Sequence, residues 1–100
     1  MRHRFHAEAL EQYEEAAQYY ASKQADLDLR FINSIQDAMR LILEDPLRWR
    51  AFYGDIHRCF TRVFPYAILY AVEPDFVLIV AVAHCSRNPG YWRHRITNSR

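Results

Sequence analysis

The chain has 100 residues, of which 51% are hydrophobic and 25% are charged, and this balance excludes a disordered protein. Its length predicts a single domain that spans residues 1–100. Two glycines exclude a collagen-like chain, and a net charge of +1 excludes a strongly charged one. No apolar run approaches the roughly 18 residues that a membrane span needs.

The first half of the chain predicts a short strand and two helices. Residues 2–5 form the strand. Residues 6–24 form the first helix, in which apolar side chains recur at helical spacing: Ala9, Tyr13, Ala16, Ala17 and Tyr20. Asp26 is placed to cap a second helix, which ends near residue 44 ahead of Pro46. Because the connection is short, we expect the helices to form an antiparallel hairpin.

The second half of the chain predicts a loop over residues 47–55 and then three strands. The strands cover residues 56–63, 64–73 and 76–84, and the last is apolar at nearly every position, which is typical of an interior strand covered on both faces. Residues 91–96 form a short terminal helix or tail. The predicted fold class is α+β with the order βααβββ, a helical hairpin packed on an antiparallel sheet.

Two helices can cover only one face of such a sheet. The chain offers only its C-terminal tail for the other face, so either Tyr91 and Trp92 fold back over that face or a partner chain covers it.

Charge is divided unevenly along the chain. Residues 1–46 carry five Lys and Arg against nine Asp and Glu, a net charge of −4, whereas residues 47–100 carry eight Arg against three acids, a net charge of +5. Arg binds carboxylates and phosphates through two parallel hydrogen bonds. The second half is therefore either a contact surface for an anionic partner or an ordinary solvated surface.

The last third of the chain gathers arginines and aromatic residues. We consider Arg87, Tyr91, Trp92 and Arg93, supported by Arg58, to be candidate target-binding residues. Such a set suits an RNA site, in which cations bind phosphates and rings stack on bases, and it equally suits a protein interface. The structural alternative is that Tyr91 and Trp92 only seal the sheet.

Other chemistry-bearing residues give weaker signals. Arg58 and Arg62 are expected on one face of one strand. His57 and Cys59 also share a face, but roughly 6.5–7 Å separates such side chains, too far for a Cys–His nucleophile, so Cys59 is expected to be a buried structural residue. We assign no catalytic residue, and no spacing indicates a metal or a cofactor.

Two stretches of the sequence are specific: FPYAILY over residues 64–70 and VAHCSRNPGYW over residues 82–92. Together with the helical segments that begin at Phe5, they resemble the RelE/ParE superfamily, the toxins of bacterial type II toxin–antitoxin systems. The resemblance implies the βααβββ fold and a cytoplasmic protein that a cognate antitoxin neutralises.

The resemblance implies two possible activities. RelE-like members cleave mRNA on the ribosome and commonly place an Arg directly after a strand Tyr, whereas here Ala67 follows Tyr66. The chain is therefore more similar to ParE members, which act in plasmid stabilisation and inhibit DNA gyrase. The alternatives are a ribosome-dependent mRNA endoribonuclease that uses Arg58, Arg87 and Tyr91, and a non-toxic binding remnant.

The partners implied by the resemblance are a cognate antitoxin, in a hetero-oligomer, and DNA gyrase, or else the ribosome and mRNA. We expect an antitoxin segment to fold on binding, either beside Tyr13, Tyr20 and Phe31 or along a strand edge.

Overall fold

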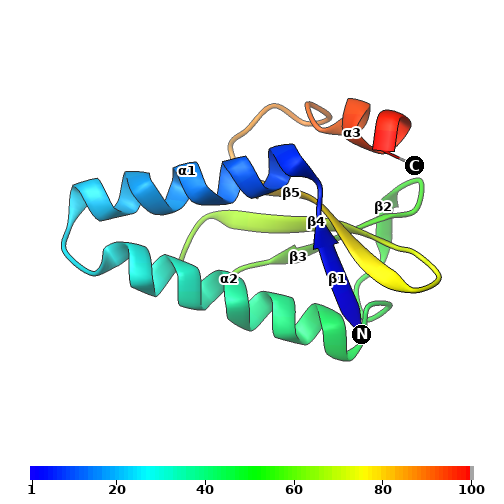
Figure 1. Ribbon diagram of the computed structural model, residues 1–100, viewed down its shortest axis with the longest axis horizontal. Helices are drawn as coiled ribbons and strands as arrows, with labels where there is room; N and C mark the ends of the chain where they lie inside the picture. Colours follow the sequence, from blue (N-terminus) through cyan, green and yellow to red (C-terminus); the bar gives the residue numbers. More distant parts are fainter. Residues whose placement is uncertain (100) are drawn as a thin grey trace.

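The computed structural model describes residues 1–99 and contains five strands and three helices. In chain order they are β1 (Arg2–Phe5), α1 (Ala7–Lys23), α2 (Leu27–Glu44), β2 (Ala51–Tyr53), β3 (Ile56–Phe60), β4 (Tyr66–Val72), β5 (Phe76–His84) and α3 (Arg93–Ser99). Figure 1 shows α1 and α2 as an antiparallel hairpin that packs against the sheet, with α3 near the beginning of α1. The predicted α+β architecture is confirmed.

The sheet is mixed, and this corrects the prediction of an antiparallel sheet. Its strand order is β1-β5-β4-β3-β2, in which β1 pairs parallel with β5 and the other neighbours are antiparallel. β1 can pair parallel with β5 because a long connection separates the two strands in the chain. The segment expected to be a loop contains the additional edge strand β2, which is too short to show a period of two in the sequence. β5 is an interior strand, as predicted.

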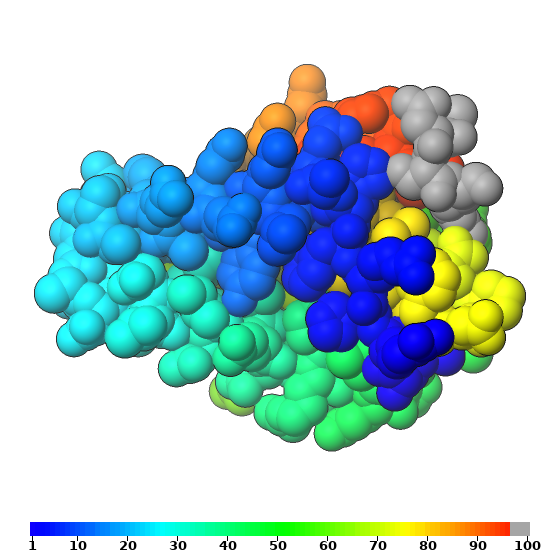
Figure 2. Space-filling model, in the orientation of Figure 1, coloured from blue at the N-terminus to red at the C-terminus, as the bar shows by residue number. Residues whose placement is uncertain are grey.

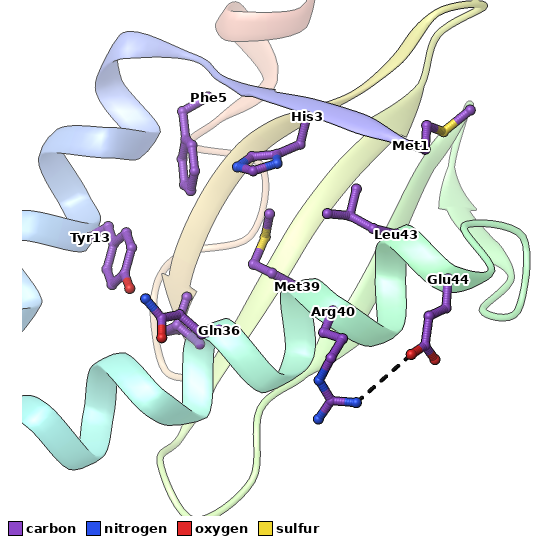
Figure 3. A pocket seen from close by; sticks show the side chains of 10 residues that line it. Met1, His3, Phe5, Tyr13, Gln36, Met39, Arg40, Leu43 and Glu44 are labelled. Carbon is purple, nitrogen blue, oxygen red and sulfur yellow. Dashed lines mark ion pairs between the residues drawn. The ribbon is translucent and has the colours of Figure 1, made fainter.

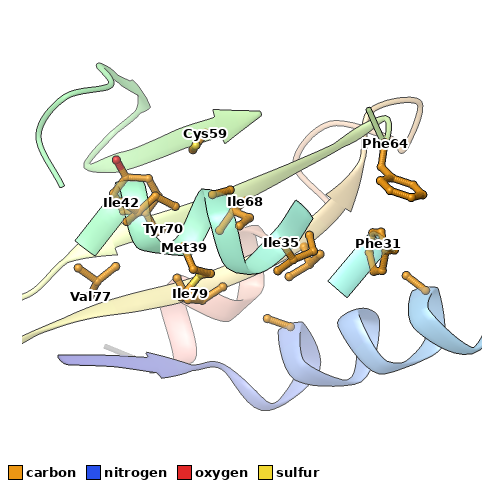
Figure 4. Packing of buried hydrophobic residues seen from close by; sticks show 14 residues of the cluster. Phe31, Ile35, Met39, Ile42, Cys59, Phe64, Ile68, Tyr70, Val77 and Ile79 are labelled. Carbon is orange, nitrogen blue, oxygen red and sulfur yellow. The ribbon is translucent and has the colours of Figure 1, made fainter. Parts of the chain in front are cut away.

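The helical hairpin supplies the larger core, on the face of the sheet that we call the helix face. Phe31, Ile35 and Ile42 from α2 are at most 1% exposed and pack against Ile68 and Tyr70 of β4 (Figure 4). Four side chains from three different segments meet around Phe31 as ring contacts: Tyr13, Tyr20, Phe64 and Tyr66. Figure 2 shows the outer surface of the hairpin beside β1.

The C-terminal segment covers the other face of the sheet, which we call the tail face. Trp92 is 4% exposed and packs with Leu69 and Val80, and Tyr91 and Ile96 pack around them. The expectation that Tyr91 and Trp92 fold back over the open face is therefore confirmed.

A β-bulge in β5 adds a residue to the tail face. Leu69 pairs with Ala81, but the next residue of β4, Tyr70, pairs with Ile79, so the register skips Val80. Val80 and Ala81 consequently both belong to the core of the tail face, although they are consecutive.

The start of α2 differs from the prediction in one detail. Asp26 is the N-cap residue, but its φ of 67° places it in the left-handed region and its side chain makes no capping hydrogen bond. The tight reversal between the two helices requires this conformation, which Asp tolerates better than most residues.

Candidate target-binding surface

A cleft of about 230 Å³ lies on the tail face, where β3, β4 and β5 meet the segment of residues 84–93. Three arginines line it, Arg58, Arg87 and Arg93, and we call it the arginine cleft. The fold thus brings together the candidate residues from β3 and from the C-terminal segment.

Arg58 is held between two aromatic rings. It extends from the tail face of β3, and its Cζ lies 4.5 Å from the centroid of the Phe52 ring and 5.0 Å from that of Phe60. Both rings are themselves accessible, Phe52 being 43% and Phe60 58% exposed. Contact with the two rings restricts the guanidinium, and Arg58 as a whole remains exposed.

Arg87 stacks on Tyr91, with a distance of 4.1 Å from its Cζ to the ring centroid. Arg95 lies 5.2 Å from the same centroid. The Tyr91 hydroxyl accepts a hydrogen bond from Nε2 of Gln12 in α1, and this bond fixes the ring that carries Arg87. Tyr91 therefore contributes to the cleft mainly by orienting Arg87.

Arg93 packs between Tyr53 and Gly90. Its Cζ lies 4.2 Å from the centroid of the Tyr53 ring, and a Cβ atom on Gly90 would come within 2.9 Å of its Nε. Gly90 also has a φ of +87°, which L side chains rarely adopt. A glycine at this position thus allows both the turn and the close approach of the Arg93 side chain.

Trp92 has a structural role in the core of the tail face. Its buried indole packs against the tail face, and the rings of Phe52 and Tyr53 contact it edge-on at 5.9 Å and 5.5 Å between centroids. Since so little of the side chain is accessible, Trp92 supports the rings that carry Arg58 and Arg93 rather than offering its own surface.

Arg95 is a buried residue that joins the C-terminal segment to α1 and β5 through hydrogen bonds. It is 5% exposed, and its Nη1 donates to Oε1 of Gln12 at 2.6 Å and to the carbonyl oxygen of Val80 at 2.9 Å. Val80 is the residue that the bulge removes from the strand register, so Arg95 supplies a donor to the carbonyl group there. The Nε of Arg95 has no hydrogen-bond partner among the described residues.

A second contact joins the C-terminal segment to α1 at the surface. Nε2 of His94 lies 3.0 Å from Oε2 of Glu8. The hydrogen bond from His94 holds the pKa of the Glu8 carboxyl below its usual value.

Arg62 does not belong to the arginine cleft, contrary to the expectation that it shares a face with Arg58. β3 ends at Phe60, two residues before Arg62, and the chain turns at Val63, which has a φ of 75°. Arg62 instead lines a separate hollow beside Arg30 and Asp37 of α2.

Cys59 is a buried structural residue on the helix face, as predicted. Burial raises the pKa of its thiol to about 11. His57 stacks on Tyr70 and bonds through Nδ1 to the carbonyl oxygen of Trp49 at 2.7 Å. Both residues are thus engaged in the core.

His84 is the only imidazole that lines the cleft within the described chain. Its Nδ1 accepts a hydrogen bond from the backbone N–H of Ser86 at 3.1 Å, and its ring meets that of Tyr66 edge-on. Burial raises the pKa of Tyr66 to about 12, so this tyrosine stays protonated at neutral pH.

A second hollow of about 610 Å³ lies on the opposite side of the molecule, between β1 and α2. Figure 3 shows His3 and Phe5 of β1 facing Met39 and Leu43 of α2 across it. An ion pair of 3.9 Å between Arg40 and Glu44 lies at its rim. β1 pairs with β5 along one edge only, so its other edge borders this groove, which we call the β1–α2 groove.

Two further observations concern residues 1–99 only. Their histidines, cysteines and acids form no group of three that could hold a metal ion. None of their helices is long and apolar enough to cross a bilayer.

Residues 3–89 match the family described as the ParE toxin of the type II toxin–antitoxin system parDE. The chain belongs to the ParE toxin family. It is a toxin component of the type II class, on the ParE side of the RelE/ParE superfamily, as the sequence motifs predicted. The ParE match ends at Pro89, so Tyr91 and Arg93 lie beyond it.

The ParE fold also agrees with a solved structure. The chain is similar to one from the chromosomal ParDE toxin–antitoxin system of P. aeruginosa, with a TM-score of 0.74 at 9% sequence identity. The similarity covers 84% of this chain and 95% of that chain. Among curated proteins, none matches the sequence significantly.

Sequence reasoning missed three aromatic residues that contact Arg58 or Arg93 at the arginine cleft, namely Phe52, Tyr53 and Phe60. The adjacent aromatic residues 52 and 53 in the predicted loop were a signal that this segment packs against another part of the chain. Which arginines they would carry depended on the pairing of β2 with β3, which no local pattern reveals.

Proposed function

We propose that this protein inhibits DNA gyrase as the toxin of a type II pair, and that a cognate antitoxin neutralises it. The observation that carries the proposal is the ParE family match over residues 3–89. The arginine cleft, with Arg58, Arg87 and Arg93 held on aromatic rings, is the surface that we propose for target binding. Such a protein acts in the cytoplasm, where its target is found.

Inhibition by binding agrees with the chemistry of the cleft. Ala67 lines it at the position where RelE-like ribonucleases commonly carry an Arg, and it presents only a buried methyl group. Cleavage of a phosphodiester relies on cations placed at the charge that develops, and losing one such contact costs roughly 3–4 kcal/mol of transition-state stabilisation.

One observation favours the alternative, a ribosome-dependent mRNA endoribonuclease. His84 lines the same cleft as Arg58, Arg87 and Tyr91, and an imidazole can transfer protons at neutral pH. The test of function therefore measures both activities.

The β1–α2 groove is the surface that we propose for the antitoxin. Its lining is mostly apolar, and the free edge of β1 offers backbone groups to an added strand. The groove agrees with the expected position beside Tyr13, which is one of its lining residues, whereas Phe31 itself is fully buried.

Purified protein is added to a plasmid supercoiling reaction with purified gyrase and, in parallel, to an in vitro translation reaction in which mRNA ends are mapped. We expect loss of supercoiling with intact mRNA. Cleaved mRNA with unimpaired supercoiling would establish the ribonuclease instead, and neither effect, together with normal growth on induction, would indicate the non-toxic remnant.

The role of the cleft is tested with Arg87→Ala combined with Arg93→Ala. This variant is expected to lose gyrase inhibition while its circular dichroism and antitoxin binding remain unchanged. Arg30→Ala is the matched control, because Arg30 is exposed on α2 away from the cleft. Loss of inhibition in both variants would contradict the assignment of the cleft.

A further inference from the structure

We propose that the arginine cleft binds an acidic polypeptide segment that carries an apolar anchor residue, so that this toxin recognises a protein part of its target and not a nucleic acid. This inference rests on the proposed function, because it names the chemistry of the target that the same cleft would contact. Three features of the cleft support it: its charge, its floor and the state of its aromatic rings.

The charge of the cleft is of one sign. Among the described residues that line it are three Arg and one His, and no Asp or Glu. A guanidinium pairs with a carboxylate through two parallel hydrogen bonds, and hydrogen bonds between ionised groups are about twice as strong as neutral ones. The lining thus favours a ligand with several negative charges close together.

The floor of the cleft is apolar and small. Ala67, Leu69 and Ala83 form its strand side, and Phe60 and Pro89 also line it. A concave space of about 230 Å³ with such walls suits one inserted side chain. A sugar–phosphate backbone has no apolar group of that shape to insert, whereas Leu or Phe in a peptide does.

Three aromatic rings at the cleft, those of Phe52, Phe60 and Tyr91, each have a guanidinium group over the ring. Arg58 stacks on Phe52 and Phe60, and Arg87 stacks on Tyr91, with centroid distances between 4.1 and 5.0 Å. Single-stranded nucleic acids are usually bound by stacking bases on free ring faces. Here a base would compete with an arginine for these rings, whereas a carboxylate can pair with the guanidinium without displacing it.

Arg58 and Arg87 lie on different segments at the cleft. Arg58 is on β3, and Arg87 is on the segment after β5, so the two flank the strand side of the cleft. A side chain inserted between them would leave acidic neighbours on either side of it within reach of both. We therefore expect Asp or Glu before and after the anchor residue.

The chemistry is tested first with a defined probe, independently of gyrase. The probe is a short fluorescein-labelled peptide in which Asp and Glu flank a central Leu, and its binding to the purified protein is followed by fluorescence anisotropy. The matched peptides replace every acid by its amide or the Leu by Gly. We expect binding at least about tenfold weaker for either replacement.

The residues are tested with the same probe. Arg58→Gln and Arg87→Gln are each expected to weaken binding about tenfold, while Arg30→Gln leaves it unchanged. Circular dichroism checks that each variant is folded. Equal binding of the acidic and amide peptides, or equal binding by the wild type and both cleft variants, would overturn the proposal.

Nucleic acids provide the competing outcome. A labelled single-stranded RNA and a DNA duplex are measured under the same salt conditions. If either binds through Arg58 and Arg87 more tightly than the acidic peptide does, the cleft is a nucleic-acid site and the proposal is wrong. Weaker binding that is insensitive to both variants supports the proposal.

The link to the target is tested with purified gyrase. A photoreactive benzoylphenylalanine replaces Phe60, which is 58% exposed at the cleft. We expect cross-links to an acidic segment of a gyrase subunit, and cross-links to DNA or to a segment without acids would overturn the proposal. If gyrase is not inhibited but the acidic peptide binds, the proposed function fails while the inferred chemistry of the cleft stands.

Discussion

The two faces of the sheet are packed by different means. On the helix face every buried strand residue except Cys59 has a large or β-branched side chain. On the tail face four of the eight buried strand residues are alanine. The helix-face set is Cys59, Ile68, Tyr70, Val77, Ile79 and Val82; the tail-face set is Ile56, Ala67, Leu69, Ala71, Leu78, Val80, Ala81 and Ala83. Two long helices cover the first face, and chiefly one indole covers the second.

The helix face therefore contributes most of the stability, whereas the tail face carries the surface that we propose for binding. Burial of apolar surface is the main favourable contribution to folding, and most of it lies on the helix face. The small residues of the tail face let Trp92 lie close to the strands, and the arginines are then displayed around its edge. Because the C-terminal segment covers only part of the tail face, a cleft remains there, whereas a second pair of long helices would have filled this space.

The largest expected effect comes from removing the central ring of the helix face. Phe31→Ala leaves a cavity among Tyr20, Phe64 and Tyr66 and should lower the free energy of unfolding by about 3–5 kcal/mol, measured by urea denaturation. Leu29→Ala on the same helix, where Leu29 is 54% exposed, should cost less than about 0.5 kcal/mol. Similar costs for the two variants would show that the helix face is not the main core.

An intermediate effect is expected on the tail face from Arg95→Met. The change leaves the carbonyl of Val80 and the amide oxygen of Gln12 without their donor, and should cost about 1–3 kcal/mol. Hydrogen exchange should increase mainly in residues 86–96 and little in α2. Unchanged or higher stability would mean that the cost of burying the charge exceeds what its hydrogen bonds contribute.

The smallest expected effect concerns the surface contact between Glu8 and His94. The pKa of Glu8 in the folded protein is lower than its unfolded value of 4.5, so the ionised carboxylate stabilises the folded state at pH values above 4.5. This contribution is lost as the pH falls through the lowered pKa. Glu8→Gln should therefore be less stable than the wild type at pH 6, and the difference should shrink towards pH 3 in urea titrations. A difference that grows as the pH falls would reverse the assigned sign.

Local patterns were enough to predict most elements of the fold. The helical spacing of apolar residues gave α1 and α2 within one residue at each end, and the apolar run of residues 76–83 gave β5 as an interior strand. Pro46 and the turn of residues 73–75 marked the boundaries. These signals act within a few residues along the chain, so a single sequence contains them.

The site was only partly predictable. Arg58, Arg87 and Arg93 do line one cleft with Tyr91, but Trp92 is buried beneath it and Arg62 lies elsewhere. The error at Arg62 arose because a period of two was extended through residues 61–63, where the chain turns at Val63 with a positive φ. A β-branched residue gives no sequence signal for that conformation.

The sequence by itself determined both long helices and the interior strand β5, the need for a cover on the second face of the sheet and the family to which the chain belongs. Only the tertiary structure decided that β1 pairs parallel, that the bulge at Val80 receives Arg95, and that aromatic rings of β2 and β3 orient the arginines. The physical reason is range: periodicity and turn chemistry act between near neighbours, whereas pairing, bulges and cation–aromatic contacts depend on segments that only the folded chain brings together.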